Sequence, residues 1–179
     1  QWVSRMIVLG NFVTKQSPFK TVYFHGMILD PHGAKMSKSK GNVVNPINVA
    51  DKYGVDALRM GLLTVTSPGN NQPYEESKVI GARNFCNKLW NIARYSEGLI
   101  GEEFSREIQA SPSSLADHWI LSKLQLAANN IDQLLTDYRV GEAYNVLYHF
   151  IWDEFADWYL EATKSQPNNS VLARVLTDS

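Results

Sequence analysis

Residues 35–42 read Lys-Met-Ser-Lys-Ser-Lys-Gly-Asn, and the interpretation of the whole chain starts from this stretch. Three lysines and two hydroxyls lie within six residues, and the turn sequence Asp30-Pro31-His32-Gly33 leads into them. Ammonium and hydroxyl groups can bind phosphate oxygens from several directions, and charge-assisted hydrogen bonds are roughly twice as strong as neutral ones. The stretch therefore predicts a mobile loop that wraps polyphosphate. The alternative is a solvated, lysine-rich hairpin tip, the usual role of a short charge run.

The segment before this loop predicts a helix and a short strand. Apolar residues recur at helical spacing over residues 2–12, and residues 21–24 (Thr-Val-Tyr-Phe) have the β-branched and aromatic content of a buried strand. A helix followed by a strand fits the closing unit of a parallel sheet. Open α/β sheets bind ligands beyond the carboxyl ends of their strands, so we expect the loop at such a rim.

Two short helices are predicted after the loop. Asn45 should cap the first and Pro46 should begin it, because an Asn side chain accepts an orphan amide hydrogen bond and the fixed backbone angle of proline suits the first turn. This helix should end near Gly54, and a second should follow over residues 55–63. A polar, proline-bearing stretch at residues 67–73 then divides the chain into two halves.

The second half has the pattern of long amphipathic helices and no strand signal. The first helix is predicted over residues 76–97 with Gly98 as its end. Its predicted apolar face consists of Val79, Ala82, Cys86, Leu89, Trp90 and Ala93. After a polar connection at residues 102–113, Ser114 and Asp117 predict a capping box for a second helix, and a third should begin near residue 140. Three such helices can pack as a bundle, so the fold class is α/β followed by all-α.

The loop and its flanks resemble the class I aminoacyl-tRNA synthetases. Residues 25–30 (His-Gly-Met-Ile-Leu-Asp), 40–46 and 53–59 are similar to the family's sequence around its signature loop. Three later stretches resemble the valyl-tRNA synthetases within this class: residues 83–91, 114–121 and 152–161. The isoleucine and leucine enzymes share the loop but differ in these stretches. An isoleucyl- or leucyl-type fragment is the alternative.

The resemblance implies the C-terminal end of a class I Rossmann-like catalytic domain with its signature loop, followed by an α-helical bundle. Residues 1–76 would belong to the catalytic domain, including helices that contact the tRNA stem, and residues 77–179 to a truncated anticodon-binding domain. Because the chain begins with Gln1, we expect a fragment whose upstream part holds the rest of the nucleotide-binding half and an editing domain. The full-length enzyme would activate valine with ATP and transfer it to tRNA(Val). The fragment alone is predicted to be inactive.

The resemblance assigns the catalytic chemistry to two lysines. Lys38 matches the motif's second lysine, whose family role is to bind ATP phosphate and stabilise the departing pyrophosphate, and Lys35 would be the supporting cation. Ser37 and Ser39 either hydrogen-bond phosphate or shape the loop, and Met36 is expected to anchor the loop by packing. The predicted ATP-binding set is Lys35, Met36, Ser37, Lys38, Ser39, His25 and Gly26.

Four further residues near the loop have predicted roles. His25 and Gly26 lie where the family's adenine pocket begins and are candidates for a supporting nucleotide contact; a hydrogen-bonded structural role is the alternative for His25. Gly33 and Gly41 are expected to act as hinges, because they let the backbone pass where a side chain would collide. Mg²⁺ would arrive with ATP, and no protein metal site is expected.

The helical half is expected to bind the anticodon end of tRNA. Candidate phosphate contacts are Arg83, Asn87, Lys88 and Arg94. A solvated helix face is the alternative for these residues. Three aromatic residues, Trp152, Trp158 and Tyr159, have the chemistry to stack on splayed bases, but their helical spacing favours the core.

Composition limits the remaining possibilities. A net charge of −1 argues against a broadly basic surface, so any RNA contact must rest on local patches. Cys86 is the only cysteine, which excludes an internal disulfide, favours a reducing compartment and predicts packing in the core. We expect a cytoplasmic protein, monomeric at full length, with no membrane partner. Two alternatives are a stand-alone tRNA-binding helical module without catalysis and an inactive synthetase-like scaffold.

Overall fold

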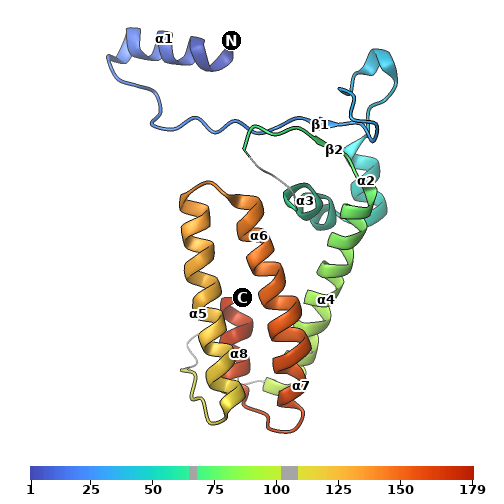
Figure 1. Ribbon diagram of the computed structural model, residues 1–179, viewed down its shortest axis with the longest axis vertical. Coiled ribbons are helices and arrows are strands. Elements are labelled where there is room, and N and C mark those ends of the chain that lie inside the picture. The colour runs from blue at the N-terminus through green and yellow to red at the C-terminus, as the bar shows by residue number, and fades with distance from the viewer. Residues whose placement is uncertain (65–67, 102–108) are drawn as a thin grey trace.

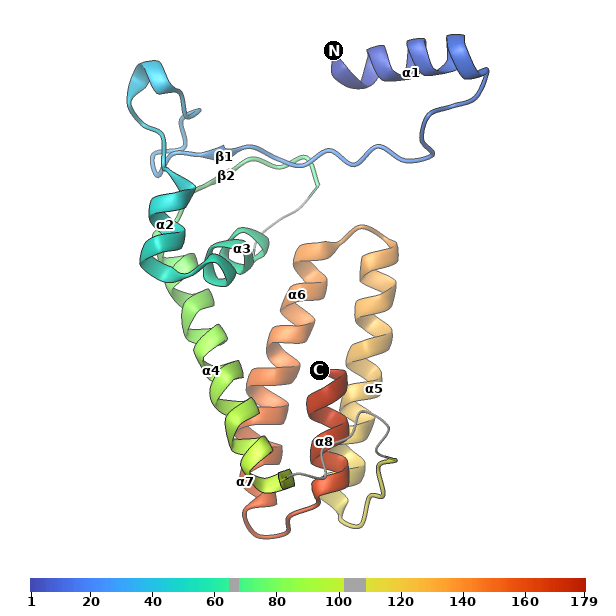
Figure 2. The ribbon, with the colours of Figure 1, turned by 180° about the vertical axis from the view of Figure 1, so that it is seen from behind.

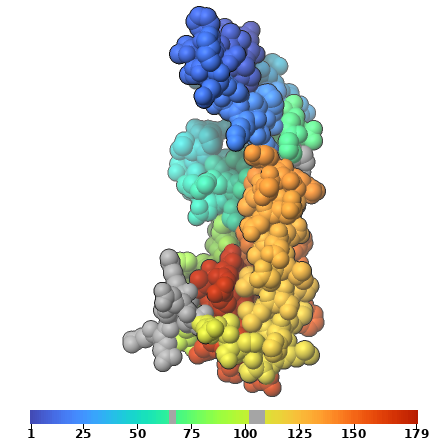
Figure 3. All heavy atoms as spheres, turned by 90° about the vertical axis from the view of Figure 1, so that its left-hand side faces the viewer, coloured from blue at the N-terminus to red at the C-terminus, as the bar shows by residue number. Residues whose placement is uncertain are grey.

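The computed structural model describes residues 1–64, 68–101 and 109–179. An extended N-terminal region with a small sheet lies at one end, and a bundle of helices lies at the other (Figures 1 and 2). The space-filling view shows the same elongated shape, with the N-terminal residues at the end opposite to the base of the bundle (Figure 3). The predicted class, α/β followed by all-α, is confirmed.

The N-terminal region consists of helix α1 (Trp2–Thr14), which has no buried residue, and an extended segment that leads to strand β1 (Ile28–Leu29). β1 pairs in parallel with β2 (Gln72–Pro73), with Ile28 opposite Gln72. The strand prediction at residues 21–24 was wrong: these residues form no strand, and Phe24 is 65% exposed. Regular pairing begins only where residues 72–74 lie alongside, with the Gln72 amide donating to the Met27 carbonyl at 3.0 Å.

The two short helices after the loop form as predicted. α2 (Pro46–Tyr53) begins after Asn45, whose Oδ1 accepts a hydrogen bond from the Ile47 amide at 3.0 Å, and α3 (Val55–Leu63) follows directly after Gly54. The predicted divide at residues 67–73 and the predicted polar connection at 102–113 lie partly outside the described residues.

Helix α4 (Glu76–Ile100) is longer than predicted and buries a different face. It continues through Gly98 to Ile100 and is capped by Gly101, whose φ of 71° favours glycine. Its buried residues are Val79, Ala82, Phe85, Ile92, Ser96 and Ile100. Trp90 is 67% exposed, and Cys86 is only partly buried. The prediction that Trp90 and Cys86 are buried was therefore wrong. Helix α4 packs against α3 on one side and against the bundle on another, and part of the predicted face borders an open groove beside α3.

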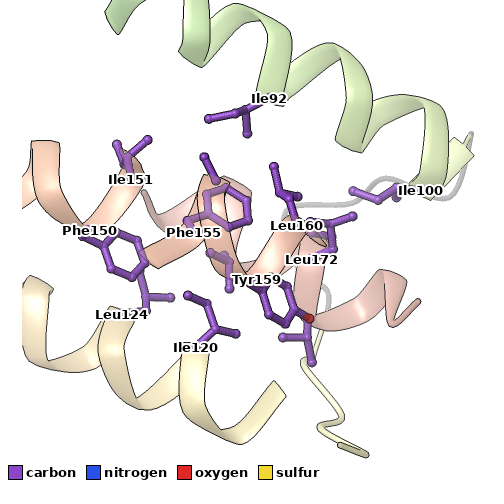
Figure 4. Close-up of a cluster of buried hydrophobic side chains, with 14 of the residues drawn as sticks. Ile92, Ile100, Ile120, Leu124, Phe150, Ile151, Phe155, Tyr159, Leu160 and Leu172 are labelled. Carbon is purple, nitrogen blue, oxygen red and sulfur yellow. The ribbon is translucent and has the colours of Figure 1, made fainter. Parts of the chain in front are cut away.

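The bundle is completed by α5 (Leu115–Thr136), α6 (Val140–His149), a π-helical segment η3 (Phe150–Tyr159), α7 (Leu160–Thr163) and α8 (Asn169–Asp178). Figure 4 shows the core, where side chains of α4, α5, η3, α7 and α8 converge. Trp158 was predicted in this core but is 71% exposed, whereas Tyr159 is 1% exposed. The π-helical segment explains this error, since its i→i+5 hydrogen bonds change the spacing that an α-helix would give.

A buried carboxylate ties the base of the bundle together. The predicted capping box at Ser114 is present, and Asp117, 1% exposed, accepts hydrogen bonds from the Ser114 amide at 3.0 Å and the Tyr159 hydroxyl at 2.8 Å. Asn168, which caps α8, donates to the same carboxylate at 2.8 Å. Asp117 therefore joins the starts of α5 and α8 to η3.

Candidate nucleotide loop and nucleic-acid face

The lysine-rich loop is a hairpin that begins directly after β1. The Asp30 amide donates to the Ala34 carbonyl at 2.8 Å, and the Gly33 amide donates to the Asp30 carbonyl at 2.9 Å, which closes a tight turn. Lys35 then returns beside Leu29 in an antiparallel bridge. The predicted lysine stretch continues as a 3₁₀ turn, η1 (Lys38–Lys40), which projects from the body of the molecule in Figure 1.

The glycines around this loop serve backbone geometry in two different ways. Gly33 and Gly41 have φ values of 80° and 66°, and a Cβ at either position would meet nothing within 4 Å. The predicted reason, avoidance of a collision, was wrong for both: they are needed because L-residues rarely adopt left-handed backbone. The collision occurs at Gly26, where a Cβ would lie 1.6 Å from the carbonyl oxygen of Asn70.

Two residues that sequence reasoning did not assign to the site organise the loop. Asp30 is 6% exposed, and its carboxylate accepts hydrogen bonds from the amides of His32 and Ala34. Asn42 donates to the same carboxylate at 2.8 Å and accepts from the Ser37 amide at 2.9 Å. The turn sequence at Asp30 and the Gly-Asn after the lysines are visible in the sequence. The hydrogen bond between Asn42 and Asp30 across the loop could not be predicted from it.

Hydrogen bonding sets the charge state of Asp30. Donation from the Asn42 side chain, followed by the Ala34 amide, lowers the pKa of the Asp30 carboxyl below its ordinary value. The group is therefore a carboxylate at neutral pH. Its charge is used to hold backbone amides, and no ion pair links it to Lys35 or Lys38 within the described ranges.

The predicted ATP-binding residues divide into exposed and anchored groups. Lys35, Lys38 and Ser39 are exposed on the loop, whereas Met36 and Ser37 are partly buried. The Val44 amide donates to the Met36 Sδ at 3.4 Å, which ties the middle of the motif to the chain that follows it. The hydroxyl oxygens of Ser37 and Ser39 lie 3.3 Å apart.

His25 and Gly26 lie before β1, on the other side of the strand from the loop. His25 is exposed, and its Nδ1 lies 2.9 Å from the Gly26 carbonyl oxygen. The backbone of Gly26 packs against Asn70, and the side chain of the next residue, Asn71, accepts a hydrogen bond from the Met27 amide at 2.8 Å. The close backbone contact gives Gly26 a structural role that does not depend on a ligand.

The predicted tRNA-binding residues on α4 are not equivalent. Arg83, Asn87 and Arg94 are exposed. Lys88 is partly buried, its Nζ lies 2.6 Å from an Asp157 carboxylate oxygen, and it stands 4.2 Å from the ring centroid of Trp152. Lys88 is thus bound to the π-helical segment, and a phosphate at this position would compete with Asp157.

A groove runs between α4 and the segment from η3 to α7. Its lining includes Asn84, Asn87, Lys88, Asn91, Tyr95 and Lys164. Asn84, Asn91 and Tyr95 were not predicted, although their spacing with Asn87 and Lys88 places these residues on one helix face. The groove also contains Asp157 and Glu161, which pair with Lys88 and Lys164, so its unpaired polar groups among the described residues are mainly the amides of α4.

The described residues contain neither a metal-ligand cluster nor a helix that could cross a membrane. No cluster of three His, Cys, Asp or Glu side chains there is arranged to hold a metal ion. Within the same ranges, no helix combines the length and apolar character that crossing a membrane requires.

Two protein-family profiles match this chain. Residues 1–75 match the profile described as tRNA synthetases class I (I, L, M and V). Residues 117–179 match the anticodon-binding domain of tRNA ligase. The two matches fall on the region of the lysine loop and on the helical bundle.

Curated relatives align with nearly the whole chain. A valine–tRNA ligase of Dehalococcoides mccartyi is 46% identical over 163 residues, which is 91% of this chain and 18% of the relative. A valine–tRNA ligase of Staphylococcus saprophyticus is 47% identical over 169 residues, 93% of this chain and 19% of the relative. The chain thus spans about a fifth of the length of the curated relatives it matches.

Solved structures share the fold at lower identity. A LeuRS of Agrobacterium radiobacter, solved as a ternary complex with tRNA and LeuAMS, superposes with a TM-score of 0.79 at 24% identity, covering 97% of this chain and 22% of that chain. Methionyl-tRNA synthetase of Mycobacterium tuberculosis bound by methionyl-adenylate gives a TM-score of 0.63 at 21% identity, covering 85% of this chain and 31% of that chain.

Proposed function

The chain belongs to the class I aminoacyl-tRNA synthetase family as a relative of its valine enzymes, and we propose that it is the part of a valine–tRNA ligase that carries the ATP-phosphate loop and tRNA-binding helices. The observation that carries this proposal is the hairpin of residues 30–42. It presents Lys35 and Lys38 to solvent on a backbone held by Asp30.

In the proposed reaction, the valine carboxylate attacks the α-phosphate of ATP, and pyrophosphate leaves. Negative charge grows on the leaving group as the bond to it breaks. Lys38 would stabilise this charge through its ammonium group, and Lys35 would support it from the start of the motif. Ser37 and Ser39 would donate hydroxyl hydrogen bonds to the same phosphates. The exposed side chains of the loop include lysines and a hydroxyl, which suit phosphate oxygens, and no carboxylate of the kind that Mg²⁺ prefers, so Mg²⁺ would enter with ATP.

The second proposed step transfers valine from the adenylate to tRNA(Val). The bundle would bind the anticodon end of that tRNA, with Arg83, Asn87 and Arg94 of α4 on its phosphates. Lys88 would contribute only if tRNA displaces Asp157 from it, because the two side chains are 2.6 Å apart. The anticodon-binding profile over residues 117–179 supports the role of the bundle; the α4 residues lie outside that match, and their contacts stay a prediction.

We place the division between the two proposed domains at Glu76, where α4 begins. Residues 1–76 would then end the catalytic domain and residues 77–179 would form the anticodon-binding part. A contact of His25 or Gly26 with the nucleotide stays a prediction, as do the monomeric state and the cytoplasmic location.

Valine-dependent ATP–pyrophosphate exchange by the full-length protein tests the function. We expect exchange with valine, and much weaker exchange with isoleucine or leucine at equal concentration. The 179-residue chain alone should support none, because it covers only about a fifth of the related enzymes. Affinity for tRNA without any exchange by the full-length protein would instead identify an RNA-binding module.

A further inference from the structure

We propose that Asp30 and Asn42 are positioning residues that hold the backbone of the lysine loop as a ring, from which the exposed Lys38 side chain projects. The inference deepens the proposed function and rests on it. Neither side chain is expected to touch the nucleotide. Both act through the backbone of the residues that do.

The Asp30 carboxylate braces the first half of the ring. Its Oδ1 accepts the His32 amide at 3.0 Å and the Ala34 amide at 2.7 Å, and its Oδ2 accepts the Asn42 side chain at 2.8 Å. At 6% exposure, the carboxylate is largely withdrawn from water. The carboxylate thus accepts three hydrogen bonds from N–H donors and, within the described residues, forms no ion pair with a lysine of the loop.

The Asn42 amide braces the second half. Its oxygen accepts the Ser37 amide at 2.9 Å, and its nitrogen donates to Asp30 and, at 3.3 Å, to the Lys35 carbonyl oxygen. One side chain therefore contacts the backbone on both sides of Met36. The lysine side chains themselves stay exposed, with no carboxylate partner in the part of the chain that the structure describes.

Bracing of the loop backbone by Asp30 and Asn42 would favour the transition state. A charged group lowers a reaction barrier most when it needs no reorganisation as charge develops. A loop that first had to order around the nucleotide would lose part of its binding energy to conformational entropy. Holding the backbone on both sides of Met36 reduces the backbone part of this loss, and only the lysine side chains remain to be ordered by the phosphates.

Valine-dependent pyrophosphate exchange by variants of the full-length protein tests the roles of Asp30 and Asn42. Asn42→Ala should lower kcat by about tenfold or more with a small change in KM for valine, because an interaction specific to the transition state is weakened. Asn42→Asp should be at least as harmful, since it sets a second carboxylate against Asp30. The exchanged pair, Asp30→Asn with Asn42→Asp, restores a donor facing an acceptor between the two side chains but leaves the Lys35 carbonyl without its donor, so it should recover part of the rate lost in Asn42→Asp. A merely destabilising substitution would not be rescued by a second one.

Combining Lys38→Ala with Asn42→Ala gives a second test. Lys38→Ala should cost a smaller factor in the Asn42→Ala background than in the unmodified protein, since residues that act as a unit are not additive. Asn45→Ala is the matched control: it removes an asparagine that caps α2 close to the loop, and it should leave exchange unchanged. An Asn42→Ala protein that matches this control, or an exchanged pair without rescue, overturns the inference.

Amide hydrogen exchange of the full-length protein separates this inference from the proposed function. The Ser37 and Ala34 amides should be protected, and Ser37 should lose its protection in Asn42→Ala. An unprotected Ser37 amide in the unmodified chain refutes the ring whatever the enzyme does. Suppose instead that the amides are protected but Lys38→Ala leaves pyrophosphate exchange unchanged. This result would show that the ring exists, and it would reject the proposed function and with it the positioning role.

Discussion

The charged residues of the loop lie in different environments. Asp30 is buried and bonded to amides, whereas Lys35 and Lys38, a few positions away, are exposed. The carboxylate accepts hydrogen bonds from N–H groups, and in the described residues it forms no ion pair with either lysine. The ammonium groups are therefore free for phosphate, and the role of each residue follows from what its charge already contacts.

The first prediction concerns Lys38. Lys38→Ala in the full-length enzyme should slow adenylate formation by about a hundredfold or more, as expected when an electrostatic partner of the transition state is removed. Valine-dependent pyrophosphate exchange measures it. Lys40→Ala removes the same charge from the same exposed turn and should have a much smaller effect. Equal losses in the two variants would assign the effect to net charge and reject a specific role for Lys38.

The second prediction concerns the pH dependence of stability through Asp117. Burial alone would raise the pKa of this carboxyl, but hydrogen bonds from Ser113, Tyr159, Asn168 and Ser114 outweigh burial and hold the pKa well below its ordinary value. A lowered folded-state pKa contributes stability that is complete above the unfolded pKa of about 3.9 and is lost as pH falls toward the folded value. The free energy of unfolding should therefore drop steeply below about pH 4.

Urea denaturation across this pH range checks the prediction. Asp117→Asn should be less stable at pH 7, by on the order of 3 kcal/mol, because the hydrogen bonds to a charged acceptor are weakened. Its stability should also vary less with pH in acid. If both proteins lose stability in parallel below about pH 4, other carboxylates cause the acid dependence.

Helix α4 is the element that connects the two parts of the chain. Val79, in its first turns, packs with Val49 and Ala57 of the small helices, while Phe85, Ile92 and Ile100 belong to the bundle core. A helix is a stiff element, so its solvent-facing residues keep a fixed relation to both parts. The exposed cations Arg83 and Arg94 lie on this shared helix.

The third prediction tests these cations. Arg83→Ala or Arg94→Ala should weaken tRNA binding by the full-length protein and reduce the slope of log affinity against log salt by about one each, the signature of a lost phosphate contact. Lys88→Ala should act differently and destabilise the bundle, because Lys88 contacts Asp157 and Trp152. Lys20→Ala, which removes an exposed cation from the extended segment before β1, is the control for charge removal. Salt slopes unchanged in both α4 variants would leave these arginines as a solvated helix face.

At the scale of the whole molecule, stability is concentrated in the bundle. The larger hydrophobic cluster includes Phe155, Tyr159 and Val171, each at most 1% exposed, whereas α1 buries nothing. The buried polar network at Asp117 lies at the base of this cluster. We expect the bundle to be the cooperative unit of unfolding, with the hairpin loop outside it.

The fourth prediction compares two aromatic residues of η3. Phe155→Ala should lower the free energy of unfolding by about 3–5 kcal/mol, the usual cost of emptying a buried aromatic site. Trp158→Ala, three residues later and 71% exposed, should change it by less than about 1 kcal/mol. Chemical denaturation of both variants checks this. Similar losses in the two would mean that the packing around η3 differs from the one described.

Local chemistry was enough to predict much of this protein. The Asn45 and Ser114 caps, the helices after the loop and the long helices of the bundle follow from contacts within a few residues, and the resemblance of the loop identified the family. Such features could be predicted because their partners are near in sequence.

Tertiary structure alone decided the features that depend on distant partners. The strand begins at Ile28 because residues 72–74 pair there, and Gly26 is required because Asn70 lies against it. The π-helical segment exposes Trp158, and the contact between Asp30 and Asn42 closes the loop. Each depends on where another part of the backbone comes to lie, which hydrophobic spacing along one segment does not encode.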